Sequence, residues 1–166
     1  IRVSLVGSEM CIRDSTNTEQ TMKLDGQAAL VTGGASGLGA ATAKALASAK
    51  VKVAILDTDI EGGKAIAKEI DGIAIECDVS NEQSGERAIE IARKNHGPAR
   101  VLINCAGIGP AERIVGKTGP MPLDNFRRVI EINLIGSFNL MRLAAADMMN
   151  LDPVSYTHLT LPTKPF

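Results

Sequence analysis

The sequence predicts an α/β fold in which a doubly wound parallel sheet is covered by helices on both faces. Three observations support this prediction. Short apolar strand patterns alternate with longer helical patterns, two of the strands are almost continuously apolar, and a glycine-rich segment joins the first strand to the first helix. The 166 residues are 45% hydrophobic and 22% charged, as expected for one α/β domain.

Four strands and four helices are expected in alternation. The strands are Ala28–Thr32, Val51–Leu56, Gly72–Glu76 and Arg100–Asn104. The helices are Gly37–Ala47, Ile60–Ile70, Asn81–Asn95 and a longer one from Leu123 to about Asn150. Right-handed crossovers then give the strand order 3-2-1-4, and the pattern ends after the fourth strand and the long helix. The Gly- and Pro-rich stretch 106–122 is expected to be either a functional loop or a flexible surface connection.

The turn after the first strand, Thr32–Gly39, reads Thr-Gly-Gly-Ala-Ser-Gly-Leu-Gly and predicts a phosphate-binding loop. The first two glycines allow a tight exit from the strand. The third lets backbone N–H groups approach a pyrophosphate at the positive end of the helix dipole, and the fourth lets the helix pack close to the sheet. An ordinary βα turn is the alternative. The predicted dinucleotide contacts in this loop are Gly33, Ser36, Gly37, Leu38 and Gly39.

Asp57, at the end of the second strand, predicts that the dinucleotide is NAD. Its carboxylate can accept hydrogen bonds from both hydroxyls of an adenosine ribose, and it would repel a 2′-phosphate. No Arg or Lys stands in the glycine-rich loop to offset that repulsion, because Ser36 precedes Gly37. The alternative is that Asp57 only caps the following helix.

The ends of the third and fourth strands supply further predicted cofactor contacts. Asp78 and Val79 follow the third strand, where a carboxylate could bind an adenine amino group; capping of the next helix, for which Ser80 is equally suited, is the alternative. The run Asn104, Cys105, Ala106 and Gly107 leaves the fourth strand, and its small residues let backbone approach the cofactor. Cys105 is interpreted as a small buried side chain rather than a reactive thiol.

Asn133 lies inside the long helix with Gly136 close behind it. Because Asn is unfavourable in mid-helix, the pair predicts a helix distortion or a bound water, with a surface-facing Asn as the alternative.

Composition excludes several classes of function. The net charge of −1 favours neither nucleic acid nor an anionic membrane surface, and no apolar run approaches membrane-spanning length. The three cysteines, Cys11, Cys77 and Cys105, have neither metal-ligand spacing nor an even-numbered disulfide framework. We therefore expect no metal site, and a cytoplasmic location is the default.

The two ends of the chain are expected to be artefacts. Codons for Glu9–Ser15 can be the reverse complement of codons for Val154–Leu159, which resembles a translated sequencing adapter. Residues 1–15 and 154–166 are therefore excluded from the fold, and 16–153 is expected to be an incomplete NAD-binding domain. Tyr156, the only tyrosine, lies in the excluded part.

These residues resemble, in order and spacing, the short-chain dehydrogenase/reductase superfamily over essentially all of 23–153. The matching positions are Thr32–Gly39, Asp57, Asp78-Val79, Asn104–Gly107 and Asn133. Finer detail around the Gly33–Gly39 loop and Phe126–Asn139 is similar to the type-2 3-hydroxyacyl-CoA dehydrogenases. The resemblance implies a Rossmann-type fold and hydride transfer between NAD and a small-molecule secondary alcohol, such as a 3-hydroxyacyl-CoA or a hydroxysteroid-like substrate. It also implies a homotetramer for the full-length enzyme.

In this family a tyrosine acts as general acid/base with its pKa lowered by a lysine, a serine orients the substrate oxygen, and a helix asparagine holds a water. Only the asparagine is matched here, as the catalytic candidate Asn133. The family's serine and its Tyr-x-x-x-Lys motif follow the long helix, beyond Pro153, and Tyr156 has Thr160 at the lysine position. The chain is therefore expected to be inactive as it stands.

Two other functions are left open by the residues alone. One is a non-catalytic dinucleotide-binding or regulatory module, which requires a gene without the downstream serine and Tyr-x-x-x-Lys. The other is a sugar-nucleotide epimerase, for which the region Asp124–Asn150 offers no supporting insertion. In a fold that ends here, the fourth strand and one face of the long helix would be uncovered, which predicts poor solubility.

Overall fold

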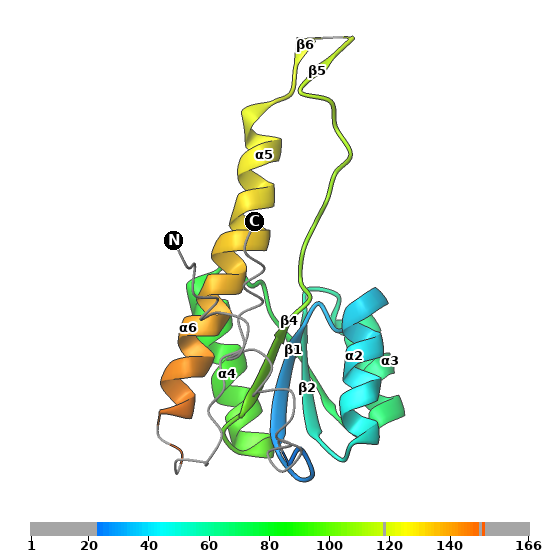
Figure 1. Ribbon diagram of the computed structural model, residues 1–166, viewed down its shortest axis with the longest axis vertical. Helices are drawn as coiled ribbons and strands as arrows, with labels where there is room; N and C mark the ends of the chain where they lie inside the picture. Colours follow the sequence, from blue (N-terminus) through cyan, green and yellow to red (C-terminus); the bar gives the residue numbers. More distant parts are fainter. Residues whose placement is uncertain (1–22, 118, 150, 152–166) are drawn as a thin grey trace, which may run out of the picture. The chain divides into compact units, whose positions relative to one another are not determined.

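The computed structural model describes residues 23–117, 119–149 and 151. All of these except Lys23 belong to one compact unit, Leu24–Leu151. Its central sheet is fully parallel, in the order β3-β2-β1-β4 (Figure 1). The strands are β1 (Ala28–Thr32), β2 (Lys52–Asp57), β3 (Ile73–Glu76) and β4 (Val101–Asn104). The predicted fold class and strand order are confirmed, and three strands begin one residue later than predicted. The predicted terminal artefacts, 1–15 and 154–166, lie outside the described residues.

Both faces of the sheet are covered, as the apolar strand patterns predict. Figure 1 shows α2 (Gly37–Ser48) and α3 (Ile60–Ile70) on one face, and α4 (Glu82–His96) on the other. Side chains alternate along the strands, so Val31 packs in the cluster with α2 and α3, whereas Leu30 packs in the cluster with α4.

Polar side chains define where two of these helices begin. The Asp59 carboxylate accepts a hydrogen bond from Gly62 N at 3.0 Å at the start of α3, and Asn81 Oδ1 accepts one from Ser84 N at 2.8 Å at the start of α4. The alternative prediction that Asp57 caps α3 is therefore wrong, because Asp59 is the cap. The alternative prediction that Asp78 or Ser80 caps α4 is also wrong, because Asn81 is the cap. Each cap lies later in the chain, which leaves those strand-end carboxylates for other contacts.

The long helix runs without a break from Leu123 to Met148 but changes its geometry in the middle. It consists of α5 (Leu123–Ile130), the π-helical turn η1 (Glu131–Gly136) and α6 (Ser137–Met148). Asn133 lies in the π-helical turn, so the predicted distortion is confirmed.

This helix is long and apolar enough to cross a membrane, by length and composition only. The sequence prediction concerned unbroken apolar runs, and charges such as Glu131 and Arg142 interrupt this helix, so the helix does not contradict it. A core helix of a soluble protein meets the same criterion. Leu140 and Ala144 of α6 are buried in the cluster with α4, so one face of the helix does belong to the core.

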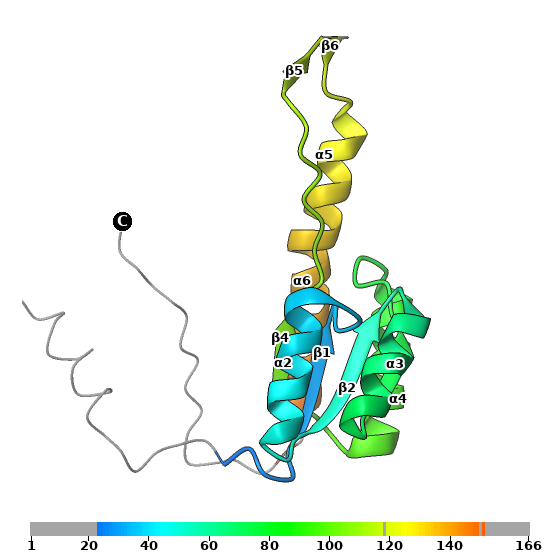
Figure 2. The ribbon, with the colours of Figure 1, turned by 90° about the vertical axis from the view of Figure 1, so that its right-hand side faces the viewer.

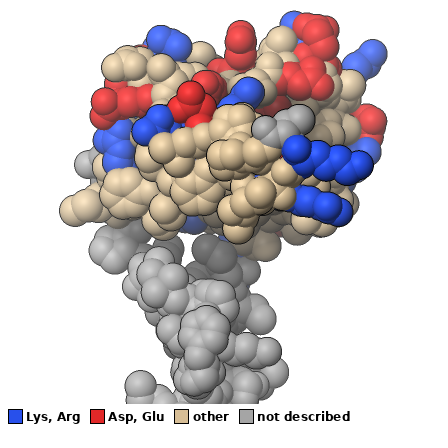
Figure 3. Space-filling view, turned by 90° about the horizontal axis from the view of Figure 1, so that it is seen from above, with Lys and Arg blue, Asp and Glu red and all other residues tan. Residues whose placement is uncertain are grey.

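The predicted loop 106–122 contains a small antiparallel hairpin, formed by β5 (Val115–Gly116) and β6 (Gly119–Pro120). Figures 1 and 2 show this hairpin and α5 extending away from the sheet. Seen from that end, charged side chains of both signs gather along one margin of the described surface, and uncharged side chains occupy much of the rest (Figure 3). Two-residue strands made largely of Gly and Pro have no periodic pattern, so the sequence did not predict them.

Candidate functional site

A cavity of about 690 Å³ lies at the carboxyl ends of the parallel strands. This is where ligands bind in open α/β sheets, and the volume is in the range of small-molecule sites. Eleven of the predicted site residues line it: Gly33, Ser36, Gly37, Leu38, Gly39, Asp57, Asp78, Val79, Cys105, Ala106 and Gly107. The other two, Asn104 and Asn133, do not line it.

The glycine-rich loop between β1 and α2 has the backbone geometry of an anion site. Gly33 and Gly37 adopt left-handed φ values of +65° and +52°. The first backbone bond of α2 is donated by Ala40 N to Ser36 O at 3.0 Å, so the N–H groups of the preceding residues have no partner within the helix. Ser36 makes no side-chain capping bond either. These N–H groups and the helix dipole are thus available to a phosphate at the cavity.

Two glycines of this loop have a different purpose from the one predicted. Gly34 does not need a left-handed φ; instead, a Cβ there would lie 2.8 Å from Cγ2 of Ile55 on β2. Gly39 was expected to bring the helix close to the sheet, but a Cβ there would overlap the carbonyl group of Gly33. In both cases the glycine is required by close approach within the loop and the strand beside it.

Asp57 connects β2 to the glycine-rich loop. Its Oδ2 accepts a hydrogen bond from Ala35 N at 2.9 Å, and its Oδ1 accepts one from Asp59 N at 3.0 Å. A carboxylate oxygen has two acceptor sites, so each oxygen keeps one for a ligand hydroxyl. The contacts therefore fix the carboxylate at the cavity without using up its capacity to bind.

The loop after β3 is held by its own polar groups. Asp78 Oδ1 accepts from Ser80 N at 2.9 Å and from Ser80 Oγ at 2.6 Å, while Asp78 N donates to Ser84 Oγ at 3.0 Å. Asp78, Val79 and Ser80 all line the cavity, and we refer to these three residues as the β3 wall. The Asp78 carboxylate thus lies at the cavity as predicted, although part of its capacity is used within the loop.

At the end of β4 the side chain that makes most of the hydrogen bonds is that of Thr32, a residue that the sequence did not indicate as part of the site. Its side chain is fully buried, and its Oγ1 accepts from Cys105 N and Ala106 N, each at 3.1 Å. Oγ1 also donates to Asn104 Oδ1 at 3.4 Å, and Asn104 Nδ2 donates to Ser137 O at 3.4 Å. Asn104 therefore joins β1, β4 and α6 instead of lining the cavity.

Asn133 acts on the cavity through a neighbouring loop. Its Nδ2 donates to Ile108 O and its Oδ1 accepts from Ile108 N, both at 2.8 Å. The residue is exposed, in agreement with the surface-facing alternative, yet both its amide oxygen and its amide nitrogen bond to this backbone. Gly107 and Ile108 line the cavity, so Asn133 fixes part of its boundary.

Several lining residues were not predicted: Leu56, Thr58, Cys77, Ser80, Ile108, Arg128, Glu131 and Ile132. The last three are spaced i, i+3 and i+4 and so share one helix face, a pattern that could have indicated them. Arg128 is the only Lys or Arg among the lining residues that the structure describes.

Comparison with known proteins identifies the family. Residues 27–153 match the family model described as short chain dehydrogenase. The chain belongs to the short chain dehydrogenase family. It is 37% identical to human 3-hydroxyacyl-CoA dehydrogenase type-2 and 39% identical to the protein of that name from Bos taurus. Each match covers 132 residues, 77% of this chain and 51% of the relative. The chain thus spans about half the length of the curated relatives it matches.

Solved structures agree with this assignment. A hydroxysteroid dehydrogenase from Escherichia coli superposes with a TM-score of 0.69 at 30% identity, covering 76% of this chain and 54% of that one. A 3-ketoacyl-(acyl-carrier-protein) reductase from Brucella melitensis, solved in complex with NADH, superposes with a TM-score of 0.67 at 33% identity. That match covers 72% of this chain and 49% of the reductase. The predicted family is therefore confirmed.

A buried thiol at the cavity makes stability depend on alkaline pH. Burial raises the pKa of Cys77 to about 11. Because the folded-state pKa lies above that of the unfolded chain, the stabilisation is complete below about pH 9 and is lost as the pH rises towards about 11. We expect the unfolding free energy to fall by about 2 kcal/mol over this window from Cys77 alone. Urea unfolding at a series of pH values should show a shallower decline for Cys77→Ala; equal slopes would contradict the assignment.

Proposed function

We propose that this chain is the dinucleotide-binding part of an NAD-dependent dehydrogenase that transfers hydride between a secondary alcohol and the nicotinamide. The observation that supports this most directly is the pairing of the glycine-rich loop with Asp57. The loop offers unpartnered N–H groups to the pyrophosphate, and a carboxylate that keeps acceptor sites lies where the ribose hydroxyls would bind. The cofactor would supply the hydride acceptor, while these residues would bind and orient it.

A preference for NAD over its 2′-phosphorylated form follows from the charges around Asp57. The glycine-rich loop contains no Lys or Arg, and Asp57 and Asp78 both line the cavity. Two unit charges about 4 Å apart repel by about 4 kcal/mol at an effective dielectric constant of 20, so even a strongly screened repulsion disfavours the phosphate.

For the substrate we propose a 3-hydroxyacyl-CoA, with a hydroxysteroid-like alcohol as the second candidate. The first agrees with the names of the curated relatives and the second with the name of the Escherichia coli structure. We also propose a cytoplasmic homotetramer that binds neither nucleic acid nor membrane. A subunit interface would cover the exposed apolar side chains of the long helix, which include Leu134, Phe138 and Met141.

We further propose that the 166-residue chain binds the dinucleotide but does not turn over. Asn133 is the one family catalytic position matched, and Tyr156, which lies outside the described residues, is followed by Thr160 where the family motif has lysine. NADH fluorescence reports binding, and absorbance at the nicotinamide band reports hydride transfer. Binding without oxidation of NADH by a ketone substrate is the expected result; absence of binding would overturn the proposed function.

Replacement of Asp57 by asparagine should shift the preference between the two cofactors. Asp57→Asn removes the charge that repels a 2′-phosphate and weakens the acceptance of ribose hydroxyls. We expect the ratio of NADPH affinity to NADH affinity to rise by about tenfold, equivalent to roughly 1.4 kcal/mol. Fluorescence titration with each reduced cofactor measures both dissociation constants.

Asp59→Asn is the matched control. It removes the same charge two residues further on, but Asp59 does not line the cavity, and asparagine caps a helix as well as aspartate does. The control should leave the cofactor ratio unchanged. An equal shift in both variants would show that overall charge, and not the Asp57 carboxylate at the ribose, decides the preference.

A further inference from the structure

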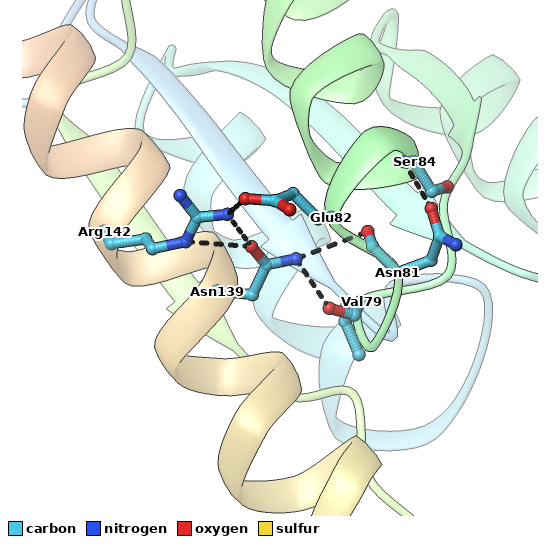
Figure 4. Close-up of polar contacts among 6 residues, drawn as sticks. All are labelled: Val79, Asn81, Glu82, Ser84, Asn139 and Arg142. Carbon is cyan, nitrogen blue, oxygen red and sulfur yellow. Dashed lines mark hydrogen bonds and ion pairs between the residues drawn. The ribbon is translucent and has the colours of Figure 1, made fainter.

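Asn139 of α6 is a buried polar residue that does not line the cavity but contacts the β3 wall. The residue is 6% exposed. Figure 4 shows its amide directed at the turn between β3 and α4, where Nδ2 donates to Val79 O at 2.9 Å and to Asn81 O at 3.3 Å. The contact therefore reaches the backbone of a cavity-lining residue from a helix sixty positions later in the chain.

The opposite side of the same amide is held by charged groups. Asn139 Oδ1 accepts from Arg142 Nε at 3.2 Å and from Arg142 Nη2 at 2.8 Å (Figure 4). Arg142 Nη2 also pairs with Glu82 Oε1 at 2.7 Å at the start of α4. Both donor hydrogens and both acceptor sites of the amide are thus used, and turning the amide over would place its oxygen against two carbonyl oxygens.

Close packing removes the space into which the β3 wall could shift. A Cβ on Gly136, one turn before Asn139, would lie 3.1 Å from Val79 Cβ. A Cβ on Gly85 of α4 would lie 3.1 Å from Asn139 Nδ2. The helix backbone therefore lies directly against Val79, and a rigid hydrogen-bonded network fixes the distance between them.

We propose that Asn139 is a positioning residue for the dinucleotide, and this proposal rests on the proposed function. By holding the Val79 carbonyl, it sets the position of the β3 wall against the bound cofactor, at the place where Asp78 would meet the adenine. The same helix holds the loop at Ile108 through Asn133. One helical segment thereby fixes two boundaries of the cavity, although neither asparagine lines it.

Asn139→Asp tests the donor to Val79 specifically. An aspartate keeps the acceptor for Arg142 but places an oxygen, instead of an N–H group, against two carbonyl oxygens. We expect NADH to bind roughly tenfold more weakly, as for the loss of a buried hydrogen bond at the wall. Fluorescence titration of the full 166-residue chain, well below its unfolding temperature, measures the dissociation constant for NADH and, by competition, for AMP. The loss of affinity should be similar for NADH and AMP, because AMP contains the adenosine half of the dinucleotide that would contact the β3 wall.

Two glycine–alanine exchanges on the same helix separate positioning from stability. Gly136→Ala favours the helix but pushes its Cβ against Val79, so it should also weaken NADH binding severalfold. Ala144→Gly weakens the helix at a buried position eight residues beyond Gly136, so it should lower the unfolding temperature and leave NADH affinity unchanged. Gly136→Ala also gives an answer if Asn139→Asp does not fold.

The outcomes distinguish the two levels of the proposal. If the unaltered chain does not bind NADH, the proposed function fails. If it binds NADH and the two variants at Asn139 and Gly136 bind as tightly, the positioning role is overturned. It is also overturned if Ala144→Gly weakens binding as much as they do, because the effect would then follow stability alone.

Discussion

Gly33→Ala should abolish detectable NADH binding and lower the unfolding free energy by about 2 to 5 kcal/mol, the combined cost of a left-handed alanine and of overpacking. Gly33 has a φ of +65°, and a Cβ there would lie 2.7 Å from Ala106 N and 2.8 Å from Cys105 C. These are backbone atoms, which cannot rotate away as a side chain could. The β1–α2 loop and the loop after β4 would have to separate, and both line the cavity. Urea unfolding and NADH fluorescence measure the two effects.

Gly26→Ala provides the matched control for this substitution. Gly26 has a similar φ of +75°, but nothing lies within 4 Å of a Cβ built there. The unfolding free energy of the Gly26→Ala variant should therefore fall only by the conformational cost of a left-handed alanine, about 1 to 2 kcal/mol, and NADH affinity should be retained. If both variants lost the same stability and both kept NADH binding, close approach of the two loops at Gly33 would not be important.

The parallel sheet could be predicted from the sequence because its determinants are local. Successive residues of a strand point to opposite faces, and where both faces are covered the strand must be apolar throughout, as in Leu30 and Val31. The β5–β6 hairpin could not be predicted in this way. Its strands are two residues long and contain no alternating pattern, and Val115, their one large apolar residue, is exposed.

The glycine-rich loop and Asp57 could likewise be predicted, because a phosphate-binding turn has its determinants within a few residues of one strand end. Thr32 and Asn139 were missed for the opposite reason. Their partners, Ala106 and Val79, lie 74 and 60 positions away in the sequence, so no local sequence pattern predicts these hydrogen bonds. Asn133 could be predicted because an asparagine is unfavourable inside a helix and because it matches the family's helix asparagine, but its partner Ile108 was not foreseen.

Thr32→Val should lower the unfolding free energy by about 2 to 4 kcal/mol, the cost of leaving a partly buried backbone N–H group unpaired together with the loss of two further hydrogen bonds. Valine has nearly the same shape as threonine, so packing in the fully buried site is kept and only the hydroxyl is removed. Cys105 N retains a bond to Thr32 O at 3.2 Å, but Oγ1 at 3.1 Å is the acceptor that the structure gives for Ala106 N. Ala106 lines the cavity, so NADH affinity should fall as well.

Thr32→Ser separates the hydroxyl from the methyl group. Serine keeps the acceptor for both backbone N–H groups and removes only one buried methyl group, so we expect a loss of about 1 kcal/mol and nearly unchanged NADH affinity. The decisive comparison is the order of the two variants in urea unfolding. If the valine variant were as stable as the serine variant, the threonine would serve as packing only. The junction of β1 and β4 would then be held by the backbone ladder, with Thr32 O as the acceptor for Cys105 N.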